Sequence, residues 1–236
     1  MKTKSVMFLI YSAFLTAMCV FGQDLDSGLN FRYDFSKETN LQFKGKFKKA
    51  DGAWILDGKK DCALVPDSGK MNISTKGVTF AATVKLNLSE KEKATNNAYD
   101  MFISKDREFI FGKWNTGHIY VNFHDGKKWC AKTKGGNALP YGEWVHVAAV
   151  IEYFNDVAKS ETGYSISLYI NGKKEYAQRF LNVTQNQKNG PVEIGCGFGG
   201  GPWFLNGEMA NVAMYDRALT SAEIAKLCSM EKRVKH

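Results

Sequence analysis

Two neighbouring segments between residues 141 and 174 constrain the fold of this 236-residue chain more than any other feature. In each segment apolar side chains alternate with other residues, at Val145, Val147, Ala149 and Ile151 and then at Tyr164, Ile166, Leu168 and Ile170. Alternation with a period of two, carried by β-branched and aromatic residues, indicates two long β-strands. Asn171-Gly172 supplies the positive φ angles of a two-residue hairpin turn, so the chain is predicted to reverse into 173–180. These segments favour an antiparallel β architecture.

Shorter segments with the same pattern fill most of the remaining chain. Strands are predicted at 29–35, 53–56, 62–65, 78–88, 100–104, 108–113, 118–124, 127–133, 192–195 and 208–215. Thr220-Ser221-Ala222-Glu223 has the pattern of a capping box and predicts a short helix that ends at Cys228. About a dozen strands with almost no helix predict a sandwich of two sheets.

The first 22 residues have the features of a targeting segment. Lys2 and Lys4 precede an apolar run at 6–21, and Gly22 is a small residue suited to a cleavage site. A membrane anchor is the alternative, but it needs about 20 apolar residues without polar interruptions. The sequence therefore predicts a signal peptide at 1–22 and a secreted or extracytoplasmic mature chain with no membrane span. That chain consists of one domain at 23–230 and a basic tail at 231–236.

Positive charge is the clearest feature of the composition. The formal net charge of +8 becomes +6 once Lys2 and Lys4 leave with the signal peptide. The charge gathers at 44–49, 127–134 and 231–236. Such clusters are either ordinary solvated surface or a binding surface for an acidic glycan or an anionic cell surface. Nucleic acid is not an expected partner, because an exported chain without a nucleic-acid motif is unsuited to it.

Four cysteines remain after removal of the signal peptide: Cys62, Cys130, Cys196 and Cys228. An even number of cysteines in an exported protein predicts two disulfides. The residues themselves allow three pairings. None of the four lies in a C-x-x-C motif, and no spacing of cysteine and histidine is typical of a zinc site.

Three stretches carry a resemblance to a known family. They read G-E-W-V-H-V-A-A-V from Gly142, Y-S-I-S-L-Y-I-N-G from Tyr164 and F-L-N-G-E-M-A-N-V-A-M-Y-D-R-A-L-T-S-A-E-I from Phe204. The chain resembles the laminin-G-like, concanavalin A-like lectin and glucanase family. This resemblance implies an all-β fold, a two-sheet antiparallel jelly-roll sandwich with a short C-terminal helix. The chain departs from the family pattern at Ala210-Asn211, where an acidic pair is usual, and at Val145, where a histidine is usual.

The resemblance also implies disulfide pairs and a metal site. Terminal strands of a jelly roll usually neighbour each other, which favours Cys62 with Cys228 and leaves Cys130 with Cys196. Related folds often hold a structural calcium ion, for which Asp57 and Asp61 are the best candidates here. Their alternative role is ordinary turn chemistry. No other cofactor is expected.

Catalysis by the mechanism of related glycoside hydrolases is not expected. That reaction needs two carboxyl groups on either side of the scissile bond, and such enzymes commonly present them as E-x-D-x-x-E on one strand. No predicted strand has carboxylates at positions i and i+2, and the glutamates are dispersed over separate elements. No G-x-S-x-G motif occurs either.

The segment 118–124 reads H-I-Y-V-N-F-H and contains the central binding candidates. If its apolar residues face the core, the opposite face presents His118, Tyr120, Asn122 and His124. This row offers a sugar a flat surface and directional hydrogen bonds, and it is supplemented by Trp129, Tyr141 and Trp203. For the aromatic residues the alternative is that they close an end of the sandwich. We therefore expect a non-catalytic carbohydrate-binding module. An extracellular protein-binding or adhesion domain is the next candidate, and a hydrolase with an unusual site is the third.

Overall fold

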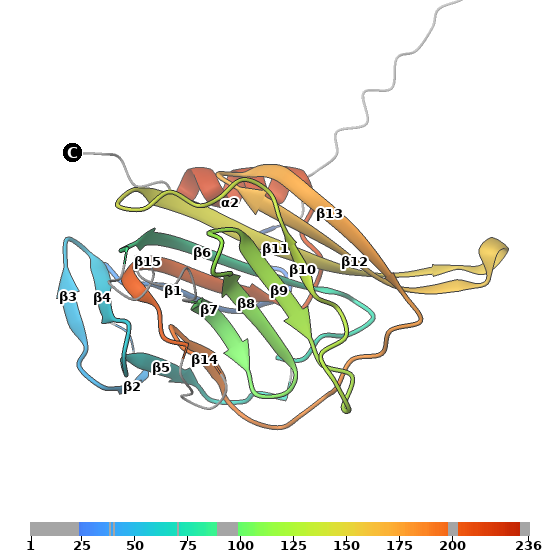
Figure 1. Cartoon of the computed structure of the whole chain (residues 1–236), viewed down its shortest axis with the longest axis horizontal. Coiled ribbons are helices and arrows are strands. Elements are labelled where there is room, and N and C mark those ends of the chain that lie inside the picture. Colours follow the sequence, from blue (N-terminus) through green and yellow to red (C-terminus); the bar gives the residue numbers. More distant parts are fainter. Residues whose placement is uncertain are drawn as a thin grey trace, which may run out of the picture.

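The computed structural model describes residues 24–37, 39, 41–69, 71–88, 99–197 and 203–231. The expected signal peptide and positions 232–236 of the basic tail lie outside these residues. Two antiparallel sheets face each other (Figure 1). Sheet A has the strand order β13-β12-β11-β6-β15-β4-β3, with β1 also paired to β15, and sheet B has the order β10-β9-β8-β7-β14-β5-β2. The predicted all-β sandwich with a short C-terminal helix is confirmed.

The strands of sheet A are β1 (Leu29–Asp34), β3 (Lys48–Ala50), β4 (Ala53–Asp57), β6 (Val78–Leu86), β11 (Trp144–Asp156), β12 (Glu161–Ile170), β13 (Lys173–Leu181) and β15 (Asn206–Tyr215). Those of sheet B are β2 (Gln42–Lys44), β5 (Cys62–Val65), β7 (Asp100–Lys105), β8 (Phe109–Lys113), β9 (Ile119–Phe123), β10 (Thr133–Gly135) and β14 (Val192–Ile194). A 3-10 turn, η1 (Val157–Lys159), connects β11 to β12, and helix α2 spans Ser221–Met230.

Most predicted strands form, and the differences have local causes. Asn171 and Gly172 adopt φ angles of 48° and 80° in the expected hairpin turn. The short strands β2 and β3 were not predicted, because their charged sequences lack alternation. The strand predicted at 127–133 is wrong in extent, since regular pairing with β9 begins only at Thr133. Before that residue the chain makes a single bridge between His124 and Trp129.

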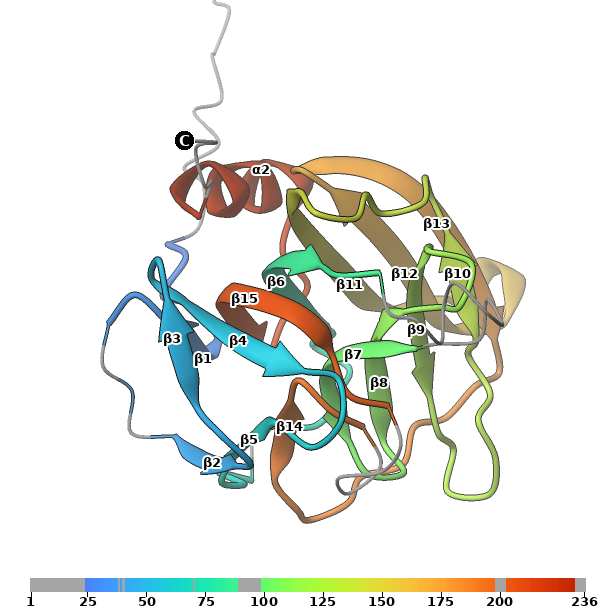
Figure 2. The same cartoon turned by 60° about the vertical axis from the view of Figure 1, so that its left-hand side comes forward.

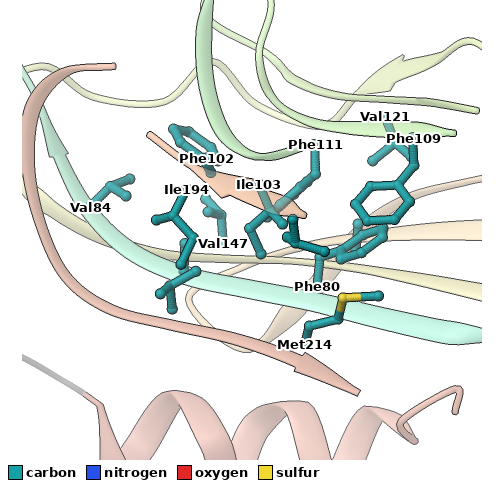
Figure 3. Packing of buried hydrophobic residues seen from close by; sticks show 14 of the residues in the cluster. Phe80, Val84, Phe102, Ile103, Phe109, Phe111, Val121, Val147, Ile194 and Met214 are labelled. Atoms are coloured by element: carbon teal, nitrogen blue, oxygen red, sulfur yellow. The ribbon is translucent and has the colours of Figure 1, made fainter. Parts of the chain in front are cut away.

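The main core lies between the two sheets and is rich in aromatic side chains (Figure 3). Phe80 from sheet A packs against Phe109 and Phe111 from sheet B, with ring centroids 4.6 and 5.9 Å apart. All three are fully buried. Burial of each such side chain stabilises the fold by roughly 1.5 to 3 kcal/mol, so these contacts hold the sheets together.

Helix α2 covers the outer face of sheet A, on the side away from sheet B (Figure 2). The capping box predicted at its start is present, with the Thr220 hydroxyl accepting from the Glu223 N–H and the Glu223 side chain accepting from the Thr220 N–H. Beneath the helix three alanines, Ala81, Ala148 and Ala213, lie in one row across β6, β11 and β15. Their small side chains let the helix approach the sheet closely. The described part of the chain has no helix on the outer face of sheet B.

The predicted cysteine pairs are wrong, and in the structure none of the four cysteines forms a disulfide. Cys62 begins β5 in sheet B, whereas Cys228 lies in α2 outside sheet A, beside Gly172. Cys130 follows β9, whereas Cys196 follows β14, and β8 and β7 lie between these strands. The terminal strands β1 and β15 are neighbours as expected, but Cys62 belongs to the other sheet.

A buried lysine stabilises the loops at one end of sheet B. Lys105 is 1 % exposed, and its Nζ lies 3.2 Å from Glu108 Oε2 and 3.8 Å from Asp67 Oδ2. The ammonium also donates to the Met71 carbonyl and the Asn72 side-chain oxygen. Burial raises the pKa of Glu108 to about 7, although Lys105 opposes this shift.

Candidate functional site

The row predicted on β9 has the predicted register but is not an open surface. Ile119, Val121 and Phe123 face the main core, so Tyr120 and Asn122 point to the outer side of sheet B. However, Tyr120 is only 5 % exposed and Asn122 only 4 %. The expectation that this row lies open to a ligand is therefore wrong. Alternation along one strand shows on which face of the sheet a side chain lies, but it does not show which side chains from other segments cover that face.

Asn122 and His124 both support the chain that follows β9. The Asn122 Nδ2 donates to the Tyr120 hydroxyl at 3.0 Å, and its Oδ1 accepts from the Ala131 N–H at 3.1 Å. His124 is 8 % exposed, and its Nδ1 accepts from the Gly126 N–H at 3.0 Å. These contacts stabilise the irregular segment that leads to β10. The two side chains therefore have a clear structural role.

The other predicted ligand residues are spread around sheet B. His118 is half-buried, and its Nδ1 shares a hydrogen bond of 2.9 Å with the Thr116 hydroxyl. Trp129 meets the His124 ring edge-on, with centroids 5.2 Å apart. Tyr141 is exposed at the end of the sandwich, where its hydroxyl accepts from Lys113 Nζ at 3.3 Å. Trp203 belongs to the group described next.

Four aromatic residues meet on the outer face of sheet B, and we call Tyr99, Trp114, Tyr120 and Trp203 the aromatic cluster. The Tyr99 ring lies 4.7 Å from that of Trp114, at 86°, and 4.8 Å from that of Trp203, at 37°. The Trp114 ring lies 4.6 Å from that of Tyr120 and covers it. Tyr99, Trp114 and Trp203 are half-buried, so each ring is held in place and still meets solvent.

The sequence prediction missed Tyr99 and Trp114, although a signal for them was present. Asp100 pairs with Lys113 at the open end of the β7–β8 hairpin. Tyr99 and Trp114 are the residues immediately outside this pair, and residues that flank a closed hairpin pair necessarily lie close together. A register for this hairpin would have placed the two rings side by side.

Two lysines lie against the aromatic cluster. Lys132 Nζ is 4.1 Å from the centroid of Trp114, and Lys134 Nζ is 5.7 Å from it. Both side chains are exposed, and among the described residues neither has a carboxylate within ion-pair distance. Such contacts over an indole are worth about 0.5 to 1 kcal/mol at exposed sites. The cluster therefore combines flat apolar surface with two ammonium groups that are available to an anion.

The two carboxylates proposed as calcium ligands, Asp57 and Asp61, accept hydrogen bonds from backbone N–H groups in turns. Asp57 Oδ1 accepts from the N–H groups of Lys59, Lys60 and Asp61 at 2.8 to 3.3 Å. Burial opposes ionisation, but these N–H groups hold the pKa of Asp57 below its usual value. Asp61 Oδ1 accepts from the Lys46 N–H at 2.8 Å. A calcium site needs six to eight oxygen ligands, and the described residues bring no three His, Cys, Asp or Glu side chains together for a metal. Asp57 and Asp61 do not fit such a site.

A polar hollow, separate from the aromatic cluster, lies beside the end of α2 on sheet A. It has a volume of about 420 Å³, and Arg32, Asp34, Asn211 and Glu231 are among its lining residues. Glu231 Oε2 accepts from the Thr83 hydroxyl at 3.3 Å and lies 3.7 Å from His146 Nε2. Burial raises the pKa of Glu231 to about 7 and lowers that of His146 to about 4. His146 is therefore uncharged near neutral pH, whereas Glu231 is about half ionised there.

Comparison with known proteins agrees with this architecture. Residues 57–225 match a family model described as the concanavalin A-like lectin/glucanases superfamily. The sequence has no significant match among curated proteins.

Several solved structures have a similar fold. Domain 4 of AbnA, an extracellular GH43 arabinanase from Geobacillus stearothermophilus solved with arabinotriose, has a TM-score of 0.56 at 16% identity, over 86% of this chain and 98% of that domain. The binding domain of Paraclostridial Mosquitocidal Protein 1 has a TM-score of 0.63 at 15% identity, over 86% of this chain and 52% of that one. A structure of botulinum neurotoxin type C has a TM-score of 0.60 at 10% identity, over 88% and 52%. The chain thus spans about half the length of the toxin chains. At these identities the similarity shows the fold alone.

Proposed function

Because this chain belongs to the concanavalin A-like lectin/glucanase superfamily, we propose that it is a secreted, non-catalytic carbohydrate-binding module that prefers glycans with acidic groups. The aromatic cluster is the observation that carries this proposal. The half-exposed rings of Tyr99, Trp114 and Trp203 lie beside the ammonium groups of Lys132 and Lys134.

Two structural neighbours give the proposal context. The AbnA domain was solved in complex with arabinotriose. The botulinum neurotoxin type C structure is described by an interaction with two ganglioside molecules. Both descriptions concern those proteins, and their sugars are not assigned to this chain. In both proteins a sandwich of this kind belongs to a chain that binds sugar-containing molecules.

The chemistry of the cluster suits a sugar with a negative group. The apolar face of a pyranose ring stacks on a Trp or Tyr ring, and these side chains lose little conformational entropy on binding. By analogy with aromatic stacking on nucleobases, each contact contributes about 1 to 3 kcal/mol. A carboxylate or sulfate on the sugar then pairs with Lys132 or Lys134. Because these lysines are exposed, the ionic part of the affinity weakens as salt rises.

The proposal of a non-catalytic module rests on the carboxylate that adjoins the cluster. Asp100 is 2 % exposed, and its Oδ2 lies 2.8 Å from Lys113 Nζ. Its Oδ1 accepts from the Asn206 N–H at 2.8 Å. Because each oxygen of Asp100 already contacts another part of the protein, this carboxylate is not placed to act on a bound sugar. Glycoside hydrolysis requires an acid and a second carboxylate that face the scissile bond.

We infer secretion from residues 1–22, where two lysines precede an apolar run and a small residue suited to cleavage. Within the described residues no helix has the length and apolar character needed to cross a membrane.

A glycan array probed with the mature protein tests the proposed function. We expect saturable binding to glycans that contain uronic acid, sialic acid or sulfate, with weaker binding to their neutral counterparts and at 0.5 M salt. Trp203→Ala should then raise Kd roughly 5- to 150-fold, which corresponds to about 1 to 3 kcal/mol. Phe154→Ala is the matched control, because this ring also lies under a cation, with the Arg179 guanidinium 4.0 Å away on sheet A. The proposal fails if no glycan binds saturably, or if both variants bind as tightly as the parent.

A further inference from the structure

Two of the four cysteines lie next to each other at the ends of neighbouring strands. In sheet B, β5 and β14 run antiparallel, and Ala63 of β5 faces Ile194 of β14. Cys62 immediately precedes Ala63, and Cys196 lies two residues beyond Ile194. The adjoining ends of the two strands therefore bring both cysteines together, with their side chains close enough to interact.

Both thiols are enclosed by the protein, with exposed fractions of 1 % for Cys62 and 0 % for Cys196. The other two cysteines have different surroundings. Cys130 Sγ donates to the Phe123 carbonyl at 3.3 Å and lies 3.8 Å from the Thr184 carbonyl. Cys228 lies over Gly172 on the outer side of sheet A. Among the described cysteines, Cys62 and Cys196 are the pair with adjoining side chains.

We propose that Cys62 and Cys196 form a disulfide when the chain folds under oxidising conditions, and that this bond anchors the segment that carries Trp203. The register places Gly195 opposite Cys62 and Cys196 one residue further along. With neighbouring strands about 4.8 Å apart and a rise of about 3.4 Å per residue, the two Cα atoms lie about 6 Å apart, within the range that a disulfide spans. The bond therefore needs only a small adjustment of the two strand ends. It joins positions far apart in the sequence, where a cross-link restricts the unfolded chain strongly.

The anchoring effect follows from the contacts around Cys196. Its carbonyl accepts from the Ser104 hydroxyl at 2.8 Å, which ties it to β7. The neighbouring Gly195 carbonyl accepts from the Leu205 N–H at 2.9 Å, two residues after Trp203. A bond from Cys196 to β5 fixes one end of the chain segment that leads to Trp203.

The reaction is a two-step exchange with a low-molecular-weight disulfide such as oxidised glutathione. One cysteine thiolate attacks a sulfur of this oxidant, which releases one reduced thiol and leaves a mixed disulfide. The second thiolate attacks the mixed disulfide, closes the Cys62–Cys196 bond and releases the second thiol. The protein loses two electrons to the oxidant and two protons. Because both thiols are buried in the folded chain, the reaction with the oxidant takes place during folding, before β5 and β14 close, and the second step follows as the two strands pair.

Disulfide mapping tests this proposal without any ligand. The full mature chain is refolded in glutathione redox buffer, and in parallel it is exported to a bacterial periplasm, so that a poor refolding yield does not prevent the measurement. Unreduced digests analysed by mass spectrometry should contain a peptide that links Cys62 to Cys196, while Cys130 and Cys228 are alkylated. Four alkylated cysteines in the folded protein, or a different linked pair, would overturn the proposal.

Thermal unfolding gives a second readout. The oxidised protein should melt roughly 10 °C above the protein kept in reductant. Cys130→Ser/Cys228→Ser should keep both the linked peptide and the shift, whereas Cys196→Ser should lose both. If Cys196→Ser does not fold, the comparison of oxidised with reduced parent protein is sufficient. An unchanged melting temperature in the linked protein would contradict a stabilising bond.

The anchoring of Trp203 rests on the proposed function and is tested separately. The reduced protein should bind its glycan several-fold more weakly than the oxidised protein. Equal affinities would overturn the anchoring but not the bond. If no glycan binds, the proposed function fails while the mapping result still stands.

Discussion

Replacement of Glu231 by Gln should make the protein more stable than the parent at neutral pH but not at acidic pH. Glu231 is 8 % exposed at the end of α2, where it accepts from the Thr83 hydroxyl and lies near His146. Burial raises its pKa from 4.5 to about 7. Gln keeps a carbonyl oxygen for Thr83 but carries no ionisable proton.

The size of the effect follows from proton linkage. Below pH 4.5 the carboxyl group is protonated in both the folded and the unfolded chain. Between pH 4.5 and 7 the unfolded chain has lost this proton while the folded chain still holds it, so the free energy of unfolding falls as pH rises. The stabilisation is complete below the unfolded pKa and is lost as pH rises through the folded pKa. Each pH unit corresponds to about 1.4 kcal/mol, which gives a total of about 3 kcal/mol.

Urea unfolding of both proteins from pH 4 to pH 8.5 measures this difference. His146 contributes the opposite trend, because its pKa is lowered to about 4 by burial and protonation favours the unfolded chain between pH 4 and 6.5. Both proteins contain His146, so its contribution cancels in the difference. Glu223→Gln is a control of opposite sign: Arg217 and the Thr220 cap outweigh burial and lower the pKa of Glu223. A difference between Glu231→Gln and the parent that is flat with pH would refute the reasoning.

Three further results are expected. Asn122→Ala leaves the Ala131 N–H without its acceptor and should cost about 1 to 3 kcal/mol in urea unfolding; an unchanged midpoint would contradict this role. Lys105→Met should lower the free energy of unfolding by about 3 kcal/mol at pH 8, because it leaves the buried Glu108 carboxylate without its cation. The loss should be smaller at pH 5.5, where Glu108, with a pKa of about 7, is protonated. Equal losses at both pH values would contradict this role of Lys105. Addition of calcium or of a chelator should leave the melting temperature unchanged, because backbone N–H groups already occupy the Asp57 carboxylate; a rise of several degrees with calcium would show a site.

The sequence predicted those features that depend on short stretches of chain. The core-facing positions of β9 follow from strict alternation at Ile119, Val121 and Phe123, and the helix start follows from the capping box at Thr220. Each of these two predictions depends only on residues that are close together in the sequence. The number of short strands predicted the two-sheet sandwich, and the family resemblance added its jelly-roll arrangement, which places distant strands side by side.

The features that were missed depend on contacts between distant segments. Tyr120 is buried because Trp114, from the end of another strand, lies over it. Alternation cannot reveal such a cover. The pairing of Cys62 was wrong for a related reason, since its neighbour is determined by which strand lies beside β5 in sheet B. The same limit applies to Tyr99, whose place in the aromatic cluster depends on the register of the β7–β8 hairpin.

The indole N–H signals in a ¹H–¹⁵N correlation spectrum test the central claim most directly. The chain has five tryptophans, of which Trp114 and Trp203 lie in the aromatic cluster, Trp54 is buried in the core and Trp129 lies beside His124. Titration with an acidic glycan selected on the array should shift the Trp114 and Trp203 signals in a saturable way and leave the Trp54 signal unchanged. Saturable shifts confined to tryptophans outside the cluster, with Trp114 and Trp203 unaffected, would contradict the account.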